Sequence, residues 1–415
     1  MTKKSDAPAI RFKGFSDAWE QRKLGDMMNV TSVKRIHQSD WTDSGVRFLR
    51  ARDIVAAAKN EEPDDYLYIS KEKYEEYSAL SGKVGVSDLL VTGVGTIGVP
   101  YLVRNLEPLY FKDGNIIWFQ NSDKIDGKFL FYSFSAEQIQ GFINESAGIG
   151  TVGTYTIESG KKTPISLPNQ IEQEKVGEFF QQLDNLITLH QRKFEKLTNV
   201  KKSMLEKMFP QNGSSYPEIR FKGFTDPWEQ RKLSEITDKV TEKNAGLQYV
   251  ETFTNSAEFG IISQRDFFDH DIAKLGSLDG YYIVKNEDFV YNPRISTSAP
   301  VGPINRNKLG RTGVMSPLYT VFRPHDIDTT YLEYFFKCGY WHSFMNFNGD
   351  SGARSDRFSI RDNVFFQMPI PIPGIDEQRK IGELLTCLDN LITLHQRELE
   401  KLQNIKKSML EKMFV

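Results

Sequence analysis

Two stretches of this 415-residue chain occur twice, and no other feature of the sequence constrains the fold as strongly. Residues 11–24 and 220–233 are identical at 12 of 14 positions, and residues 183–209 and 388–414 are identical at 23 of 27 positions. A tandem duplication of this kind repeats a short motif, a divergent region and a helix in the same order. We therefore expect two structural repeats rather than one large core.

The duplication divides the chain into six segments. These are a first motif (1–24), a first divergent domain (25–166), a first helix (167–212), a second motif (213–233), a second divergent domain (234–370) and a second helix (371–415). Nearly equal frames around different inserts favour one scaffold that presents two different specificities. The alternative is a duplicated structural domain that drifted, but drift alone does not explain why the helices stayed alike while the inserts changed.

The repeated helices carry one narrow apolar stripe each. The stretch from Ile171 to Phe209 contains no proline and one glycine, so it predicts a helix of about 39 residues, roughly 58 Å long. Steps of three, four and seven residues are typical of a coiled-coil seam. Because the two stripes are nearly identical, we expect them to pack as an antiparallel pair with pseudo-two-fold symmetry. The predicted seam or partner-interface residues are Leu183, Ile187, His190, Phe194, Leu197, Met204, Leu388, Ile392, His395, Leu399, Leu402 and Met409.

The histidine on each stripe has two interpretations. His190 and His395 could form a metal pair or a pH switch, or they could be polar seam residues that fix the register of the helices. The second interpretation needs no further ligand, and we favour it.

The divergent inserts contain clusters of the side chains that proteins use to contact DNA bases and phosphates. Arg47, Arg50 and Arg52 alternate with apolar residues, which predicts a strand with one basic face. Residues 285–311 hold five basic and two acidic residues in a chain whose net charge is −2. The predicted DNA-contact residues are Arg47, Arg50, Arg52, Thr92, Thr96, Lys112, Thr151, Thr154 and Tyr155 in the first insert, and Arg294, Ser296, Thr297, Arg306, Arg311, Arg354 and Arg357 in the second.

The motifs of the common enzyme classes do not fit. Gly93-Gly95-Gly98 and Gly148-Gly150-Gly153 have the spacing of a dinucleotide or S-adenosylmethionine loop, but strand-like sequences follow both, where such a loop requires a helix. We interpret them as turns between strands. The Asn292-Pro293-Arg294 stretch is a poor match to the motif of adenine methyltransferases. No phosphate-binding G-x-x-x-x-G-K-[ST] loop is present, and the histidines lack metal-ligand spacing.

The overall charge argues against a free-standing, non-specific nucleic-acid binder, which would usually be basic. Much of the phosphate neutralisation would then come from a partner. The N-terminus lacks an apolar signal segment, and the two cysteines form no disulfide or metal pattern, so we expect a cytoplasmic protein.

The W-E-Q-R-K-L motifs, the L-D-N-L-I-T-L-H-Q-R…K-K-S-M-L-E-K-M-F helices and the divergent inserts together resemble the specificity subunit of type I restriction–modification systems. The resemblance covers nearly the whole chain. It implies an α+β fold, in which two α/β target-recognition domains with twisted sheets are separated by an antiparallel coiled coil.

The resemblance also implies a function. Such a subunit has no catalytic site and reads a bipartite double-stranded DNA target with an unspecified spacer. It directs two methyltransferase (modification) subunits and the restriction/translocase subunits to that target. S-adenosylmethionine, ATP and Mg²⁺ would belong to these partners, and this chain would bind no cofactor. Base-contacting residues differ between members, so the contact residues named above rest on composition and position alone.

Two other functions remain open at this point. A methyltransferase with unrecognised motifs would bind S-adenosylmethionine on the isolated chain. A coiled-coil scaffold unrelated to DNA would be unaffected by exchange of residues 25–166.

Overall fold

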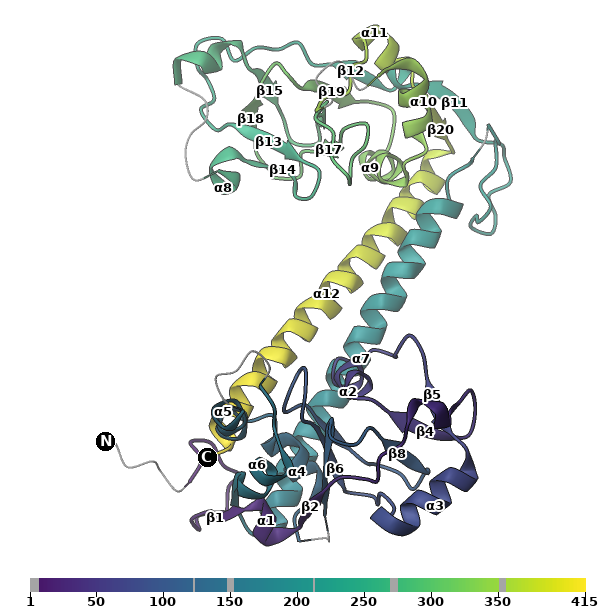
Figure 1. The fold of residues 1–415 in the computed structure, drawn as a ribbon. Helices are drawn as coiled ribbons and strands as arrows, with labels where there is room; N and C mark the ends of the chain where they lie inside the picture. The colour runs from purple at the N-terminus through teal and green to yellow at the C-terminus, as the bar shows by residue number, and fades with distance from the viewer. Residues whose placement is uncertain (1–6, 122–123, 148–152, 212, 269–274, 351–355) are drawn as a thin grey trace. The chain divides into compact units, whose positions relative to one another are not determined.

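The computed structural model describes residues 7–121, 124–147, 153–211, 213–268, 275–350 and 356–415. The chain forms two compact units. Unit 1 comprises Met1–Gln191 and Gln396–Val415, and unit 2 comprises Arg192–His395. Each unit contains one divergent insert and a portion of each long helix (Figure 1). The duplication in the sequence is therefore a duplication of three-dimensional structure.

Unit 1 contains two four-stranded sheets, with the strand orders β2-β9-β6-β7 and β3-β5-β4-β8. Its elements are β1 Glu20–Lys23, α1 Leu24–Met27, β2 Asn29–Thr31, η1 Gln38–Asp40, β3 Trp41–Thr42, β4 Val46–Leu49, α2 Ala51–Ala58, β5 Leu67–Ile69, α3 Lys71–Ser81, β6 Leu89–Thr92, β7 Pro100–Leu102, β8 Leu109–Phe111, β9 Ile116–Gln120, α4 Gly127–Ser133, α5 Glu137–Ser146, α6 Ile157–Lys162 and β10 Pro164–Leu167. The first sheet is antiparallel throughout, whereas β4 and β8 in the second sheet are parallel.

The first sheet of unit 1 separates two hydrophobic cores. Leu89 and Phe119 pack with the buried residues of α4, whereas the alternate residues Leu90 and Trp118 pack with the second sheet and α3. Successive side chains of a strand point to opposite faces, so a strand buried on both faces reads as a continuous apolar run. The sequence L-L-V-T of β6 and the sequence I-I-W-F-Q of β9 are such runs.

Unit 2 repeats the first of these sheets and replaces the second. Its elements are β11 Glu229–Lys232, η2 Leu233–Glu235, β12 Thr237–Lys239, β13 Phe253–Ser256, β14 Gly260–Ser263, α8 Gln264–Phe267, η3 Leu275–Gly280, β15 Tyr282–Val284, β16 Phe289–Tyr291, β17 Ile304–Arg306, β18 Gly313–Met315, β19 Thr320–Pro324, α9 Thr329–Cys338, α10 Trp341–Asn348, α11 Asp362–Phe365 and β20 Pro369–Ile372. The order β12-β19-β16-β17 matches β2-β9-β6-β7 strand for strand. The hairpins β13-β14 and β15-β18 stand where unit 1 has its second sheet.

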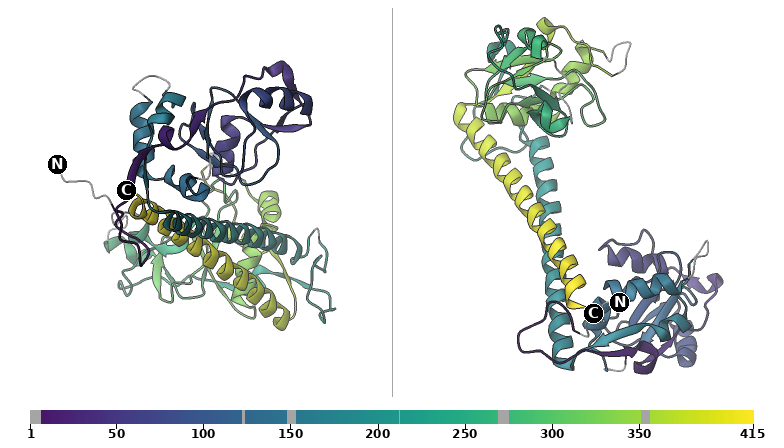
Figure 2. Two further views of the ribbon diagram at one scale, coloured as in Figure 1. Left: turned by 90° about the horizontal axis from the view of Figure 1, so that it is seen from below. Right: turned by 90° about the vertical axis from the view of Figure 1, so that its left-hand side faces the viewer.

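The same alternation of side chains holds in unit 2. Phe289 and Phe322 pack with α9, α10 and α11, whereas Val290 and Val321 pack with the hairpin residues Phe253 and Met315. Figure 2 shows the strands and short helices of each unit from two further directions. The two inserts thus share a sheet and its two-sided burial while having little sequence in common.

The long helices are α7, Gln170–Lys207, and α12, Ile375–Met413. They run antiparallel in both units: in unit 1 Lys406 Nζ lies 2.6 Å from Asp184 Oδ1, and in unit 2 the equivalent Lys201 pairs with Asp389. Tyrosines from α4 and α9 complete these contacts, since Tyr132 donates to Asp184 at 2.7 Å and Tyr334 donates to Asp389 at 2.8 Å. Burial raises the pKa of both tyrosines, so each hydroxyl stays protonated and can donate.

The repeated motif docks on these helices in the same way in both units. In unit 1 Arg11 donates to both carboxylate oxygens of the fully buried Glu172, at 2.6 and 2.8 Å. Arg220 binds Glu377 in the same bidentate manner in unit 2. The motif tryptophans Trp19 and Trp228 are buried nearby. Each motif is therefore fixed to a long helix by an arginine–glutamate ion pair, Arg11–Glu172 or Arg220–Glu377, which we call the clasp.

The backbone of each motif also bonds to the last turn of a long helix. The Ile219 N–H donates to the Lys207 carbonyl at 2.9 Å, a contact between neighbouring parts of the chain. The Ile10 N–H donates to the Lys412 carbonyl at 3.0 Å, a contact between residues about 400 positions apart in the sequence.

The predicted α+β architecture, with two α/β domains and an antiparallel helix pair, is confirmed.

Candidate nucleic-acid interface

Two loops meet at the end of the shared sheet in unit 1. One is the glycine-rich turn between β6 and β7, and the other precedes α6. The Gly93 N–H donates to the Asn115 carbonyl at 2.8 Å, and the Tyr155 N–H donates to the Gly93 carbonyl at 2.9 Å. A Cβ atom at position 93 would lie 2.6 Å from the Tyr155 carbonyl oxygen, so only glycine fits there. As predicted, the first glycine motif is a turn between strands. Gly148 and Gly150 lie outside the described residues.

The same two loops meet in unit 2. The Phe358 N–H donates to the Pro293 carbonyl at 2.7 Å, and the Ile295 N–H donates to the Asp356 carbonyl at 3.1 Å. Pro293 therefore occupies the place of Gly93, and Phe358 occupies the place of Tyr155. A tight turn at Ser296 and Ala299, which exchange backbone hydrogen bonds, ends the first of these loops. Each insert thus presents one loop pair on a common frame, with different residues.

The three arginines near residue 50 do not form one basic strand face. β4 ends at Leu49, so only Arg47 lies on a strand, and its guanidinium carbon lies 3.9 Å from the centre of the Tyr66 ring. Arg50 is the residue before α2 and binds both Asp53 and Asp65. Arg52, in the first turn of α2, also pairs with Asp65, at 2.5 Å. The prediction of one strand through all three arginines was wrong, because β4 ends at Leu49 and helix α2 begins at Ala51.

Two further predicted contact residues in the first insert are buried and form hydrogen bonds within the protein. Thr92 is fully buried, donates to the Thr96 carbonyl at 2.6 Å and accepts from the Val99 N–H at 2.9 Å. Tyr155 is buried, and its hydroxyl bonds to Thr163. These two side chains shape the loops, so we omit them from the proposed interface.

The remaining candidates of the first insert lie nearer the solvent. Thr96 and Thr154 are exposed, one on each of the two loops that meet in unit 1. Lys112 is half-buried, 4.0 Å from Asp113. Thr151 lies outside the described residues.

The basic window of the second insert is largely neutralised by carboxylates that are distant in sequence. Arg306 is 8% exposed and pairs with Glu287 at 3.0 Å and with the buried Glu333 at 2.7 Å. Arg311 forms a bidentate pair with Glu251, at 2.8 Å for both nitrogens. We therefore omit Arg306 from the proposed interface. The positive charge of Arg311 is already offset by Glu251.

The loop pair of unit 2 holds the cations that stay free of such partners. Arg294, Ser296, Thr297 and Arg357 are all exposed, and no carboxylate among the described residues forms an ion pair with either arginine. Arg354 lies outside the described residues. Among the predicted DNA contacts of this insert that the structure describes, these four are exposed and lie on the loop pair.

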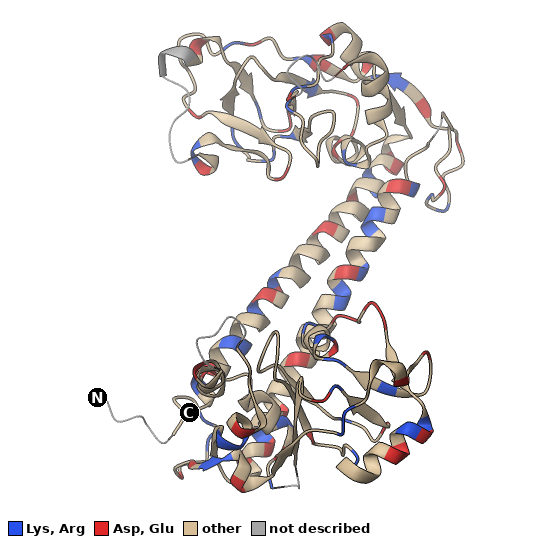
Figure 3. Cartoon of the chain, in the orientation of Figure 1, with Lys and Arg blue, Asp and Glu red and all other residues tan. Residues whose placement is uncertain are grey.

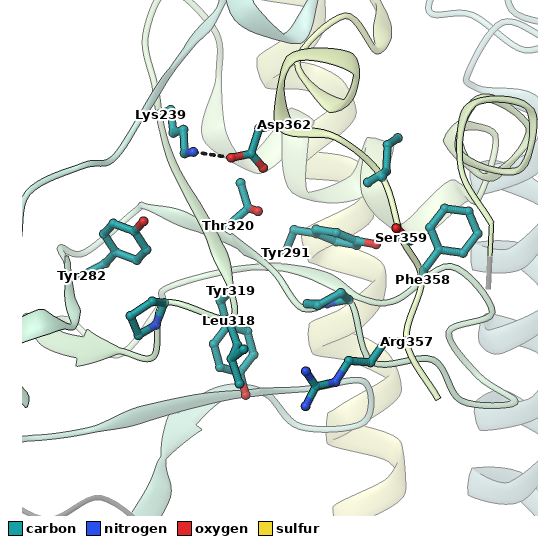
Figure 4. Close-up of a pocket in the computed structure, with 13 residues that line it drawn as sticks. Lys239, Tyr282, Tyr291, Leu318, Tyr319, Thr320, Arg357, Phe358, Ser359 and Asp362 are labelled. Carbon is teal, nitrogen blue, oxygen red and sulfur yellow. Dashed lines mark hydrogen bonds and ion pairs between the residues drawn. The ribbon is translucent and has the colours of Figure 1, made fainter. Parts of the chain in front are cut away.

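A pocket of about 460 Å³ lies beside this loop pair in unit 2 (Figure 4). Aromatic side chains, among them Tyr282, Tyr291 and Tyr319, contribute to its wall. Lys239 and Asp362 form an ion pair within it, and Arg357 is its third charged residue. The pocket therefore has one unbalanced positive charge.

The predicted seam residues lie on the covered face of each helix. Leu183 and Leu388 are buried. The others are half-buried, namely Ile187, His190, Phe194, Leu197, Met204, Ile392, His395, Leu399, Leu402 and Met409. By contrast, Leu186 and Leu189 on α7 are 43% and 46% exposed, and their equivalents Leu391 and Leu394 on α12 are 37% and 51% exposed.

The polar face of the helices mixes both signs of charge. Figure 3 shows lysines and arginines interspersed with acidic residues along α7 and α12. The Lys–Asp–Tyr contacts and the Arg–Glu clasps were not predicted. Asp184 recurs as Asp389 and Arg11 recurs as Arg220, and this recurrence was a signal that could have identified one residue of each contact.

No helix in the described ranges has the length and apolar character needed to cross a membrane. Within the same ranges, His, Cys, Asp and Glu side chains do not gather in groups of three or more that could hold a metal ion.

Comparison with known proteins places this architecture in a family. The family model described as the type I restriction modification DNA specificity domain matches residues 16–199 and again residues 225–404. The MjaVIII specificity subunit of a type I restriction enzyme from Methanocaldococcus jannaschii is 25% identical over 308 residues, which is 70% of each chain. The putative MjaX specificity subunit of the same organism is 24% identical over 423 residues, covering 94% of this chain and 92% of that one.

A solved structure supports the fold. The S subunit of a type I restriction–modification system from M. genitalium aligns over 99% of both chains, with a TM-score of 0.58 and 13% sequence identity. The two family matches together cover most of the sequence, one match for each divergent insert. The chain therefore belongs to the type I restriction–modification DNA specificity family, and it is a specificity subunit, the non-catalytic component of these systems.

Proposed function

We propose that this specificity subunit reads a bipartite double-stranded DNA target with an unspecified spacer, unit 1 reading one half and unit 2 the other. The observation that carries the proposal is the pair of equivalent loops on a common sheet. Thr96 and Thr154 occupy these loops in unit 1, and Arg294 and Arg357 occupy them in unit 2. One frame whose loops carry different side chains can contact two different stretches of duplex, through base edges and through phosphates.

We further propose that the chain recruits two methyltransferase (modification) subunits and the restriction/translocase subunits, and that these partners carry S-adenosylmethionine, ATP and Mg²⁺. Support comes from the long helices. Exposed apolar side chains that lie together on one surface can mark protein–protein contacts. Leu186 and Leu189 form such a patch in unit 1, and Leu391 and Leu394 form the equivalent patch in unit 2. The assembly would act in the cytoplasm, where its DNA is.

The target is tested by methylome sequencing of cells that carry the chain with its partner subunits. We expect one methylated motif made of two short sequences with a fixed gap. Exchange of residues 25–166 for another insert should change one half of the motif and leave the other half intact. A contiguous motif, or a change in both halves, would contradict the proposal.

Partner recruitment is tested by the double variant Leu186→Glu/Leu189→Glu, with the mass of the assembled complex as the readout. We expect the complex to lose one modification subunit. Leu106 is 81% exposed in the insert of unit 1, so Leu106→Glu is a matched control that should leave the assembly whole. Tight binding of S-adenosylmethionine to the isolated chain would instead favour a methyltransferase.

A further inference from the structure

Arg294 and Arg357 are held opposite each other by the backbone of unit 2. The two residues form an antiparallel bridge. The hydrogen bonds on either side of it, Phe358 N–H to Pro293 carbonyl at 2.7 Å and Ile295 N–H to Asp356 carbonyl at 3.1 Å, make them a non-hydrogen-bonded pair. In such a pair both side chains leave the same face, with Cβ atoms roughly 4.5–5.5 Å apart.

Like charges directly opposite each other on paired strands are destabilising. Other arginines of unit 2 have carboxylate partners. Arg306, Arg311 and Arg323 each bind a carboxylate within 3.0 Å. No ion pair to a described carboxylate relieves Arg294 or Arg357, and Asp362, the acidic residue in the adjoining pocket, is paired with Lys239 (Figure 4). The bridge therefore places two positive charges side by side, and neither forms an ion pair with a described carboxylate.

We propose that Arg294 and Arg357 together bind a backbone phosphate of the DNA half-site read by unit 2. This inference rests on the proposed function and identifies the group contacted. A base edge carries no net charge, so a guanine contact would leave the repulsion between the guanidinium groups in place. A backbone phosphate carries one negative charge, offsets that repulsion and accepts hydrogen bonds from both groups. Phosphate contacts fix the orientation of a protein on the duplex and carry no sequence information themselves.

The pair has no charged counterpart in unit 1. The hydrogen bonds that equate Gly93 with Pro293 and Tyr155 with Phe358 place Val94 and Thr154 at the positions of Arg294 and Arg357. Unit 1 must therefore orient its half-site by other contacts.

The test uses the full-length chain and a fluorescently labelled DNA duplex of random sequence, titrated at several salt concentrations. Each phosphate contact that is lost reduces the slope of log K against log salt by about 0.9. We expect Arg294→Gln and Arg357→Gln to lower the slope, and the double variant to lower it by no less than either single change. Arg311→Gln is the matched control, because Arg311 is also an exposed arginine of unit 2 but already pairs with Glu251.

Three results separate the possible failures. An unchanged slope in the double variant, with an unaltered urea unfolding midpoint, would overturn the phosphate assignment while leaving DNA recognition standing. Loss of binding to the methylated target alone, with random DNA unaffected, would show a base contact and would also overturn it. No binding of either duplex by the wild-type chain, alone or with its modification subunits, would overturn the proposed function itself.

Discussion

At the scale of single residues, charged side chains decide how each repeated motif is held. Glu172 is fully buried and Arg11 is 12% exposed, so the ion pair between them is shielded from water. A buried pair is weak evidence for net stabilisation, but removal of one partner leaves an uncompensated charge in the interior. The same holds for Arg220 and Glu377 in unit 2.

We expect Arg11→Gln to lower the free energy of unfolding by about 3 kcal/mol, because the Glu172 carboxylate loses both of its hydrogen bonds to the guanidinium. The double variant Arg11→Gln/Glu172→Gln should recover a large part of that loss, since it leaves no buried charge. Urea unfolding of all three proteins measures the coupling. Additive effects of the two substitutions would contradict the clasp.

A second residue-scale prediction concerns pH. Burial against Trp341 lowers the pKa of His342 below its ordinary value, so the folded state favours the neutral ring. The stability that depends on the neutral ring is present above the unfolded pKa, near 6.5, and is lost as the pH falls through the lower pKa of the folded state. The Tm of the wild type should therefore fall between about pH 7.5 and pH 5.5. A Tm of His342→Gln that falls equally over this interval would exclude His342 as a cause.

The fate of each arginine could not be predicted from the sequence alone. Residues 285–311 do carry a net positive charge in the sequence. Arg306 and Arg311 nevertheless form ion pairs with Glu333 and Glu251, respectively, which lie outside this window. Ion pairing is a tertiary property, and a charge count over a window does not include partners that fold back onto it. Arg294 and Arg357 were predicted as contacts, but their bridge was invisible because 62 residues lie between them.

At the scale of elements, the long helices were the most predictable part of the chain. The stretch from Ile171 to Phe209 was predicted to be helical, and α7 runs from Gln170 to Lys207. The heptad-like stripe and the proline-free sequence are local properties, so they survive in any tertiary context. The sheets were less predictable, because β6 and β16 share a place and a pairing order but scarcely a residue.

The glycine within each helix gives an element-scale prediction. Gly177 and Gly382 are equivalent, but a Cβ at Gly177 would lie 2.9 Å from the Phe129 backbone nitrogen, whereas a Cβ at Gly382 would meet the Thr330 methyl group at 3.1 Å. Backbone cannot move aside as a side chain can. Gly177→Ala should destabilise the protein by roughly 1–3 kcal/mol, despite the better helix propensity of alanine.

Gly382→Ala is the matched comparison and should cost clearly less, because the gain in helix propensity, about 1 kcal/mol, offsets a mild overlap. Urea unfolding of the two variants measures the difference. Equal stability of the two variants would mean that α4 does not pack as closely on α7 as the structure shows.

At the scale of the whole molecule, the proposed function makes the helices the spacer between two DNA contacts. Insertion of four residues, about one helical turn, into a long helix should change the spacer length of the methylated motif. Both half-site sequences should stay the same, because the loop pairs are untouched. Methylome sequencing reads both properties at once, and an unchanged gap would argue against this role of the helices.

The hydrogen bond from Ile10 to Lys412 has a topological consequence. Motif and helix end meet there just as Ile219 and Lys207 meet in unit 2, where a short connection joins them. Each unit therefore contains the same contact between a motif and a helix end, whether or not a short connection joins the two segments. A gene rearranged so that translation starts at the second motif should encode a chain with the same two contacts and with the two divergent inserts in reversed genetic order.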